Sequence, residues 1–152
     1  MKTVITLTTD FGQRDGYVGQ MKGKILTINP EATIIDITHD ISAYAVMEAA
    51  LVLKAAIPQF AFPCIHVAVV DPGVGSRRKP IAVKVDSKYL IGPDNGIFSL
   101  LLDDLENYEV RTIENVDFME RKISNTFHGR DVFAPAAAKL SLGYDFPGVG
   151  PQ

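Results

Sequence analysis

The segment Ile65-His66-Val67-Ala68-Val69-Val70, followed by Asp71-Pro72-Gly73-Val74-Gly75, carries the clearest structural signal in this chain of 152 residues. A short apolar run bounded by turn residues is typical of a central strand that is covered on both faces. Asp71 closes the run, and Pro72 and Gly73 end the strand. We therefore expect a buried strand with an acidic side chain at its carboxyl end, the edge where α/β sheets bind ligands.

Strand, turn and helix patterns alternate along the rest of the chain. The apolar segment 3–9 predicts a strand that runs into Asp10-Phe11-Gly12, and the apolar spacing over 17–28 predicts an amphipathic helix. The other expected elements are strands at 33–37, 81–85, 89–91 and 108–113 and helices at 46–57, 97–105 and 131–142. This alternation predicts an α/β fold, a three-layer α/β/α sandwich with a largely parallel or mixed central sheet.

Length and composition indicate one globular domain with a substantial core, because 47% of the residues are hydrophobic and 22% are charged. We expect the α/β domain to cover residues 1–142. Residues 143–152 are rich in Gly and Pro. That composition is typical of a linker at a domain boundary.

Charge and cysteine content argue against several classes of partner. The net charge is −3 without a long basic run, which offers no electrostatic basis for binding nucleic acid or an anionic membrane surface. No stretch is long and apolar enough for a membrane span, and the first residues lead into a strand rather than a signal region. Cys64 is the only cysteine, which predicts no disulfide, no metal site and a cytoplasmic location.

Two acidic residues follow the first expected strand. Asp10 stands at the mouth of that strand, where a carboxylate can accept two hydrogen bonds from a ribose diol. Asp15 is a second candidate for this role. Alternatively, either side chain simply caps the helix that follows.

The segment after the central strand combines Asp71 and two glycines with Arg77 and Arg78. Such a density of special residues indicates a polar site, although Asp-Pro-Gly also forms ordinary turns and either arginine could make only a surface ion pair. Gly92-Pro93-Asp94-Asn95-Gly96 leaves a similar choice open. It is either a plain turn or a loop in which Asn95 hydrogen-bonds a ligand.

The three histidines stand in different contexts. His128 follows Phe127 and precedes Gly129 at the start of an expected helix, where a polar ligand is favoured, so it is a candidate proton acceptor. His66 lies within an apolar strand and is expected in the core. His39, in the segment Asp36-Ile37-Thr38-His39-Asp40, could orient a loop, and its role stays open.

Four blocks of this sequence closely resemble the S-adenosylmethionine hydroxide adenosyltransferases. These enzymes are also called adenosine-forming S-adenosylmethionine hydrolases and are relatives of the fluorinating and chlorinating enzymes. The blocks are 8–12 with 17–19 and 21–23, then 36–41, then 69–75 with 92–96, and finally 126–135. Together they span nearly the whole chain.

The resemblance implies a role for each candidate residue. It implies that Asp71, Arg78 and His128 form the catalytic set that activates water, with Arg78 preferred over Arg77 by spacing. It also implies that Asp10 binds the ribose hydroxyls. The substrate-binding residues expected on this basis are Asp10, Phe11, Asp15, Asn95, Phe127 and Gly129.

The implied reaction is hydrolysis of S-adenosyl-L-methionine at ribose C5′, which gives adenosine and L-methionine without a cofactor or a metal. Family members carry a C-terminal β-rich domain that residues 1–152 do not include, and a homotrimer is expected when that domain is present. The alternatives are an S-adenosylmethionine-dependent halogenase and a truncated nucleoside-binding domain without turnover. Hydrolysis is preferred over halogenation because the carboxylate of Asp71 would repel a halide.

Overall fold

The structure is a computed structural model that describes residues 3–152. Its strands are β1 (Val4–Thr9), β2 (Thr33–Thr38), β3 (Cys64–Val69), β4 (Pro80–Val85), β5 (Lys88–Pro93) and β6 (Glu109–Thr112). Its α-helices are α1 (Tyr17–Ile28), α2 (Val46–Ala56), α3 (Ser99–Leu102) and α4 (Ala134–Ser141). Short 3₁₀ turns are η1 (Ile57–Gln59), η2 (Val116–Phe118) and η4 (Phe146–Val149), and η3 (Gly129–Phe133) is a π-helical turn.

Within the described residues, the six strands form one mixed sheet in the order β2-β1-β3-β5-β4-β6. Strands β2, β1, β3 and β5 run parallel, whereas β4 is antiparallel to both of its neighbours. The reversal arises because β4 and β5 form a hairpin, with Val85 paired to Lys88 across the two-residue turn Asp86-Ser87. The expected mixed sheet is therefore confirmed.

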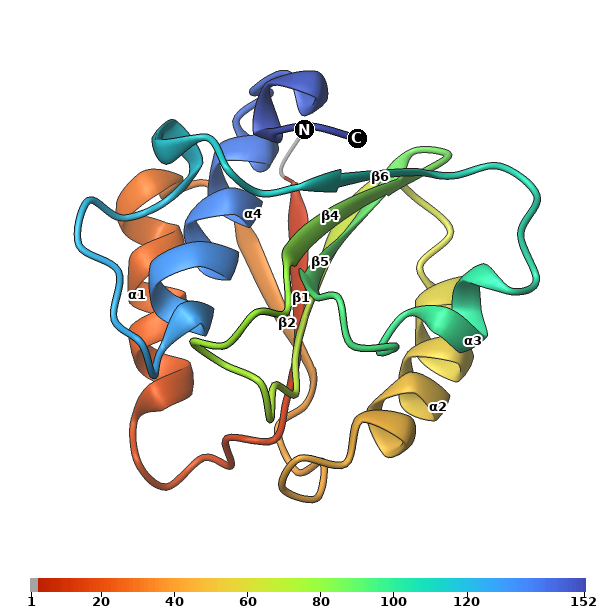
Figure 1. Ribbon diagram of the computed structural model, residues 1–152, viewed down its shortest axis with the longest axis horizontal. Coiled ribbons are helices and arrows are strands. Elements are labelled where there is room, and N and C mark those ends of the chain that lie inside the picture. Colours follow the sequence, from red (N-terminus) through yellow and green to blue (C-terminus); the bar gives the residue numbers. More distant parts are fainter. Residues whose placement is uncertain (1–2) are drawn as a thin grey trace.

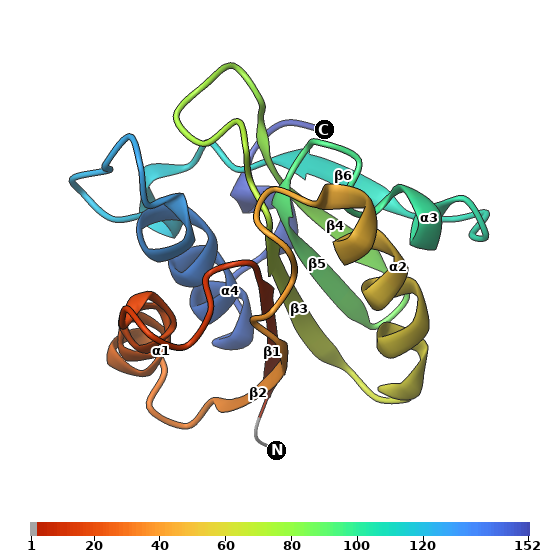
Figure 2. The ribbon, with the colours of Figure 1, turned by 90° about the horizontal axis from the view of Figure 1, so that it is seen from below.

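Helices cover both faces of the sheet, as expected for three layers. Figure 1 shows α1 and α4 on one side of the sheet and α2 and α3 on the other, and Figure 2 shows the same division after a quarter turn. Strand β3 contributes side chains to the cores on both faces of the sheet. Val67 packs in the core beneath α1 and α4, and Ala68 packs in the core beneath α2 and α3. This explains why the segment Ile65–Val70 has no alternation of polar and apolar residues.

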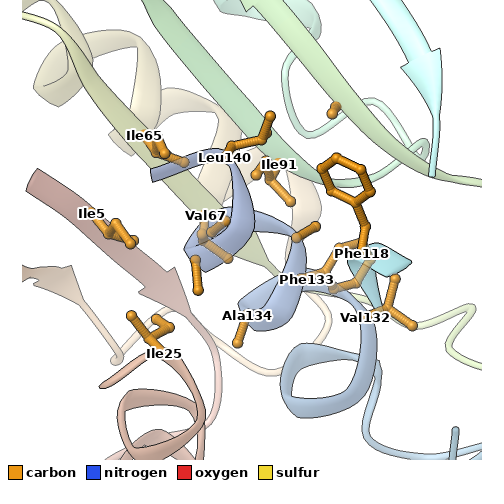
Figure 3. Packing of buried hydrophobic residues seen from close by; sticks show 14 of the residues in the cluster. Ile5, Ile25, Ile65, Val67, Ile91, Phe118, Val132, Phe133, Ala134 and Leu140 are labelled. Atoms are coloured by element: carbon orange, nitrogen blue, oxygen red, sulfur yellow. The ribbon is translucent and has the colours of Figure 1, made fainter. Parts of the chain in front are cut away.

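The larger core lies beneath α1 and α4. Figure 3 shows Leu140 of α4 beside Ile65 of β3 and Ile91 of β5, and Ala134, at the start of the same helix, belongs to the same cluster. Small alanines on α4 let the helix approach the sheet closely, and Ala134, Ala136, Ala137 and Ala138 are all fully buried. Close packing here places the residues just before α4 at the carboxyl edge of the sheet.

The structure departs from the expected elements in two places. The helix expected at 97–105 is only the short α3, with Ile97 and Phe98 buried in the turn before it. The helix expected at 131–142 starts as the π-turn η3, so Asp131 is not its cap but a buried side chain within that turn.

Residues 143–152, expected to form the start of a linker, pack against the sheet in this structure. Phe146 and Val149 are buried, Phe146 stacks on Tyr89 with ring centroids 5.2 Å apart, and the N–H of Thr112 donates to the carbonyl of Pro151. The Gly and Pro content suggested a linker, but two apolar anchors attach the segment to the sheet. A further domain after it stays a prediction.

Across residues 3–152, none of the helices combines the length and the hydropathy needed to cross a membrane.

Candidate active site

A cavity of about 270 Å³ opens at the carboxyl ends of β1 and β3. Four segments surround it: the β1–α1 loop, the β2–α2 loop, the loop after β3, and the segment before η3. It is lined by Asp10, Phe11, Tyr17, Ala43, Tyr44, Val69, Asp71, Val74, Thr126, Phe127, His128 and Gly129. The location agrees with the general rule that parallel sheets bind ligands at this edge.

The three expected catalytic side chains meet at this cavity: Asp71 and His128 line it, and Arg78 contacts both of them. The Nε of Arg78 donates to both oxygens of Asp71, at 2.9 and 3.0 Å, and its Nη2 also donates to Oδ2. The same Nη2 lies 2.8 Å from Nδ1 of His128. The side chains of Asp71 and Arg78 are only 4% and 8% exposed. The simple surface ion pair is therefore excluded for Arg78, whereas Arg77 is exposed.

The hydrogen bonds assign the protonation state of His128. A guanidinium can only donate, so Nδ1 accepts and a neutral imidazole carries its hydrogen on Nε2. Burial lowers the pKa of His128, and the charge of Arg78 lowers it further, although Asp71, the Ser124 backbone and Asp131 oppose the change. His128 is therefore neutral at neutral pH.

The face of Phe133 supports Arg78 from η3. The guanidinium carbon lies 5.4 Å from the centre of the Phe133 ring, and Phe133 is fully buried. A cation over a desolvated aromatic face is attracted by the ring quadrupole. The guanidinium is thus held by a carboxylate, an imidazole and a ring, which restricts it to one orientation.

Gly75 allows the loop after β3 to touch the segment before η3. Its φ is +75°, and a Cβ built there would lie 2.4 Å from the backbone oxygen of Asn125. No side chain fits at that distance. The glycine that drew attention in the sequence therefore brings together the two loops that carry Asp71 and His128.

Asp131 holds the segment that carries His128, a role that the sequence did not suggest. Its carboxylate is buried, accepts the N–H of Ser124 at 2.8 Å and pairs with Arg130. The hydroxyl of Ser124 in turn accepts the N–H of Phe127 at 2.8 Å. Its only signal was an acidic residue at the start of an expected helix, which indicated a cap instead.

Aromatic rings form one wall of the cavity. Phe11, Tyr17 and Phe127 meet edge to face, with ring centroids 5.4 to 6.1 Å apart. Gly129 lies against them, and a Cβ there would approach both Phe11 and Phe127 at 3.3 Å. Phe11, Phe127 and Gly129 were expected here, whereas Tyr17 was expected only as part of a helix face.

Asp10 lines the cavity, and its Oδ2 accepts the backbone N–H of Tyr44 at 2.8 Å. Tyr44 itself has a positive φ of 63° and an exposed ring at the rim. The capping alternative is excluded for Asp10 and Asp15, because the N-cap of α1 is Gly16 and no side chain caps it. Asp15 is exposed outside the cavity lining, so its substrate contact stays a prediction.

Asn95 serves the fold in this structure. Its Nδ2 donates to the carbonyl of Val70 at 2.9 Å, and its Oδ1 accepts the N–H of Ile97 at 3.2 Å. Both ends of the amide are therefore engaged by the backbone, and Asn95 is outside the cavity lining. Its expected contact with a nucleoside stays a prediction. Among residues 3–152, no group of three His, Cys, Asp or Glu side chains could hold a metal ion.

Comparison with known proteins identifies the family of this chain. Residues 5–150 match the family model of the SAM hydroxide adenosyltransferase N-terminal domain. The chain is 48% identical over 149 residues to the (R)-S-adenosyl-L-methionine hydrolase of Methanocaldococcus jannaschii, and the match covers 93% of this chain and 55% of that protein. The fluorinase of Actinopolyspora mzabensis is more distant, at 24% identity over 98% of this chain and 58% of its own.

Among solved structures, an uncharacterized conserved protein from Thermotoga maritima has a TM-score of 0.93 and 41% identity. That match covers 96% of this chain and 57% of the other. The chain thus spans little more than half the length of the relatives it matches. It belongs to the SAM hydroxide adenosyltransferase family and corresponds to the N-terminal domain of that family.

Proposed function

We propose that this chain supplies the water-activating part of an enzyme that hydrolyses S-adenosyl-L-methionine at ribose C5′, giving adenosine and L-methionine. The observation that carries the proposal is the contact of Arg78 with both Asp71 and His128, which line one cavity. The 48% identity to a protein named (R)-S-adenosyl-L-methionine hydrolase supports the same substrate.

The reaction needs an activated nucleophile more than an activated leaving group. The sulfonium departs as a neutral thioether, so no general acid is required on that side. The oxygen of water bonds to C5′, the C5′–S bond breaks, and its electron pair stays on sulfur. The proton of the water passes to a protein group and then to solvent.

In this proposal Asp71 accepts that proton. Oδ1 of Asp71 accepts only one hydrogen bond from Arg78 and keeps a second lone pair, whereas Nδ1 of His128 already accepts from Arg78. Arg78 fixes the plane of the carboxylate, and His128 holds Arg78 from its other side. A neutral His128 also adds no second positive charge near the cationic sulfur, because burial and Arg78 lower its pKa.

Substrate binding is proposed to follow the lining of the cavity. Asp10 would accept the ribose hydroxyls, while Phe11, Phe127 and Gly129 would pack against the nucleoside. Halide transfer is less well supported, because Asp71 lines the cavity and its carboxylate would repel a halide there, and because the fluorinase match has half the identity of the hydrolase match.

Chromatographic detection of adenosine after incubation with S-adenosylmethionine tests the proposal. We expect adenosine and methionine in equal amounts, no 5′-chloro-5′-deoxyadenosine at high chloride, and loss of product in Asp71→Asn. The exposed Arg77→Ala variant is the control and should retain the rate. Adenosine formation that survives Asp71→Asn would contradict the mechanism, and adenosine binding without turnover would favour the non-catalytic alternative.

A homotrimer completed by a further β-rich domain, a cytoplasmic location, and the absence of a cofactor and of nucleic-acid partners are also proposed on the resemblance. The lengths of the relatives support a further domain, since this chain covers 55% of the Methanocaldococcus protein. Sedimentation equilibrium of a version extended by that domain tests the trimer.

A further inference from the structure

His39 is a buried histidine close to the cavity that has no part in the proposed water activation. It follows β2 directly, is 2% exposed, and faces the end of β1. Its Nδ1 lies 2.7 Å from the hydroxyl of Thr9, and its Nε2 lies 2.7 Å from Oδ1 of Asp36. The other oxygen of Asp36 binds Nζ of Lys22 at 2.7 Å.

These contacts form a chain with a defined direction. The ionised carboxylate of Asp36 only accepts, so Nε2–H of His39 donates to it and Nδ1 accepts from the hydroxyl of Thr9. The Thr9 oxygen in turn accepts the backbone N–H of Phe11 at 3.2 Å. Every donor between Lys22 and Phe11 has an acceptor, and each bond sets the orientation of the next.

The main chain of His39 holds the same loop at a second point. Its carbonyl accepts the N–H of Gly12 at 2.8 Å. Asp10 therefore lies between segments that are hydrogen-bonded to His39 directly or through Thr9: Thr9 precedes it, and Phe11 and Gly12 follow it. Asp10 and Phe11 both line the cavity, whereas His39 does not.

We propose that His39, with Asp36 and Thr9, is a positioning residue that holds the carboxylate of Asp10 at the angle needed to accept both ribose hydroxyls. The inference rests on the proposed function, since it takes a nucleoside as the ligand. One oxygen of Asp10 is already fixed by the N–H of Tyr44, so small rotations of the loop move the remaining acceptor positions relative to the ribose. The chain through His39 prevents that rotation and so determines selectivity for ribose over 2′-deoxyribose.

Neighbouring threonines of β1 provide a matched pair of substitutions. Thr9→Val removes the hydroxyl that links His39 to Phe11, and Thr9→Ser keeps it. Thr8→Val is the control, because the Thr8 hydroxyl is buried and has no hydrogen-bond partner within the described residues. The two valine variants keep the shape of the side chain and lose only the hydroxyl, whereas Thr9→Ser keeps the hydroxyl and loses one buried methyl group.

Calorimetric titration with adenosine and with 2′-deoxyadenosine measures the selectivity. We expect the wild type to prefer adenosine and Thr9→Val to reduce that preference by about tenfold, the effect of one lost hydrogen bond. Thr9→Ser and Thr8→Val should change it by less than about threefold. An equal loss of affinity for both nucleosides in Thr9→Val would overturn the inference, because a general structural defect does not distinguish the two sugars.

Amide hydrogen exchange of Phe11 and Gly12 supplies a readout that needs no ligand. We expect faster exchange at both positions in Thr9→Val and His39→Ala and unchanged exchange in Thr8→Val. Unchanged exchange in Thr9→Val would overturn the inference even if the wild type binds adenosine. Failure of the wild type to bind either nucleoside would instead overturn the proposed function and the ribose role, while exchange still decides whether His39 holds the loop.

Discussion

Strand β3 carries a polar cluster near each end, and the two clusters differ in charge: the one near the amino end is uncharged, whereas the one at the carboxyl end contains an ion pair. Near the amino end, Nδ1 of His66 lies 2.6 Å from the hydroxyl of Thr6, and Nε2 lies 3.1 Å from Sγ of Cys64. Just beyond the carboxyl end, Asp71 forms an ion pair with Arg78, and the guanidinium of Arg78 also hydrogen-bonds to His128. Both clusters hold a histidine by hydrogen bonds, but His128 lines the cavity of the candidate site, whereas His66 is fully buried.

The difference shows what distinguishes a packed polar group from a candidate site. Burial, with a smaller contribution from the charge of Lys88, lowers the pKa of His66 to about 4, and burial raises the pKa of the Cys64 thiol. The imidazole and the thiol of the amino-end cluster are therefore both uncharged at neutral pH. The carboxyl-end cluster retains two charges beside open space, which costs stability unless the charges are paired.

The largest expected effect comes from removing Arg78. Arg78→Ala leaves the buried carboxylate of Asp71 without a partner, and loss of one member of a buried pair costs about 3–5 kcal/mol of unfolding free energy. Urea denaturation measures this loss, with Arg77→Ala as the exposed control. Equal stability of the two variants would show that the ion pair is not needed to keep Asp71 buried.

Lowering the pH should destabilise the protein, because folding lowers the pKa of His66 and of His128. In the unfolded chain His66 takes up a proton near pH 6.5, whereas in the folded protein its pKa is about 4. The unfolded state therefore binds more protons between these values, so stability is complete above pH 6.5 and falls as the pH falls toward 4. At about 1.4 kcal/mol per pKa unit, His66 accounts for a loss of about 3 kcal/mol.

Unfolding at a series of pH values checks this expectation. His128 contributes with the same sign, because its pKa is also lowered. His66→Gln should flatten the curve between pH 4 and 6.5 without reducing adenosine formation at pH 7 per folded molecule. A curve of unchanged slope in this variant would mean that other groups cause the acid sensitivity.

Substitution of Asp131 should affect the carboxyl-end cluster alone. Asp131→Ala leaves the N–H of Ser124 without its acceptor, and we expect a loss of about 1–3 kcal/mol. It also removes a negative charge that raises the pKa of His128, so that pKa should fall further, as measured by NMR titration of the ring. Asp117→Ala, at an exposed position of η2, is the control. An upward change in the pKa of His128 would contradict this account.

The smallest expected effect comes from substituting two residues with positive φ that lie at opposite ends of the sheet. Tyr44, at the rim of the cavity, has φ 63°, and Asp86, in the β4–β5 turn, has φ 51°. Replacing either by glycine relieves strain but adds freedom to the unfolded chain, so thermal unfolding should show a change of about 1 kcal/mol or less. Only Tyr44→Gly should weaken adenosine binding, and an equal effect of Asp86→Gly would show that the cavity is not the site.

Much of the layered fold could be predicted because its elements are marked locally. The apolar run before Asp71 and the helical spacing after Tyr17 both appear in the structure near the expected bounds. The tail could not be predicted in this way. Its Gly and Pro content is that of a linker, and the burial of Phe146 depends on Tyr89, a distant residue in the sequence.

The candidate site was predicted less completely than the fold. Asp10, Phe11, Phe127 and Gly129 line the cavity as expected, but Asn95 is occupied by backbone groups and lies outside its lining. No local sequence pattern indicates the role of Asp131 or of the hydrogen bonds that run through His39. A buried acid that holds a distant N–H looks, in a sequence, like a helix cap.

By itself, the sequence determined that a buried strand ends in Asp71, that glycines follow it, and that an arginine and a histidine of the right types are available. Apolar periodicity and turn residues act over a few positions, so these features can be read locally. The tertiary structure alone decided how these residues meet: Arg78, already preferred over Arg77 by spacing, pairs with Asp71, and His128, 50 positions away, reaches the same guanidinium. That arrangement depends on the contact of Gly75 with Asn125 and on the packing of Phe133, which no short segment of the chain contains.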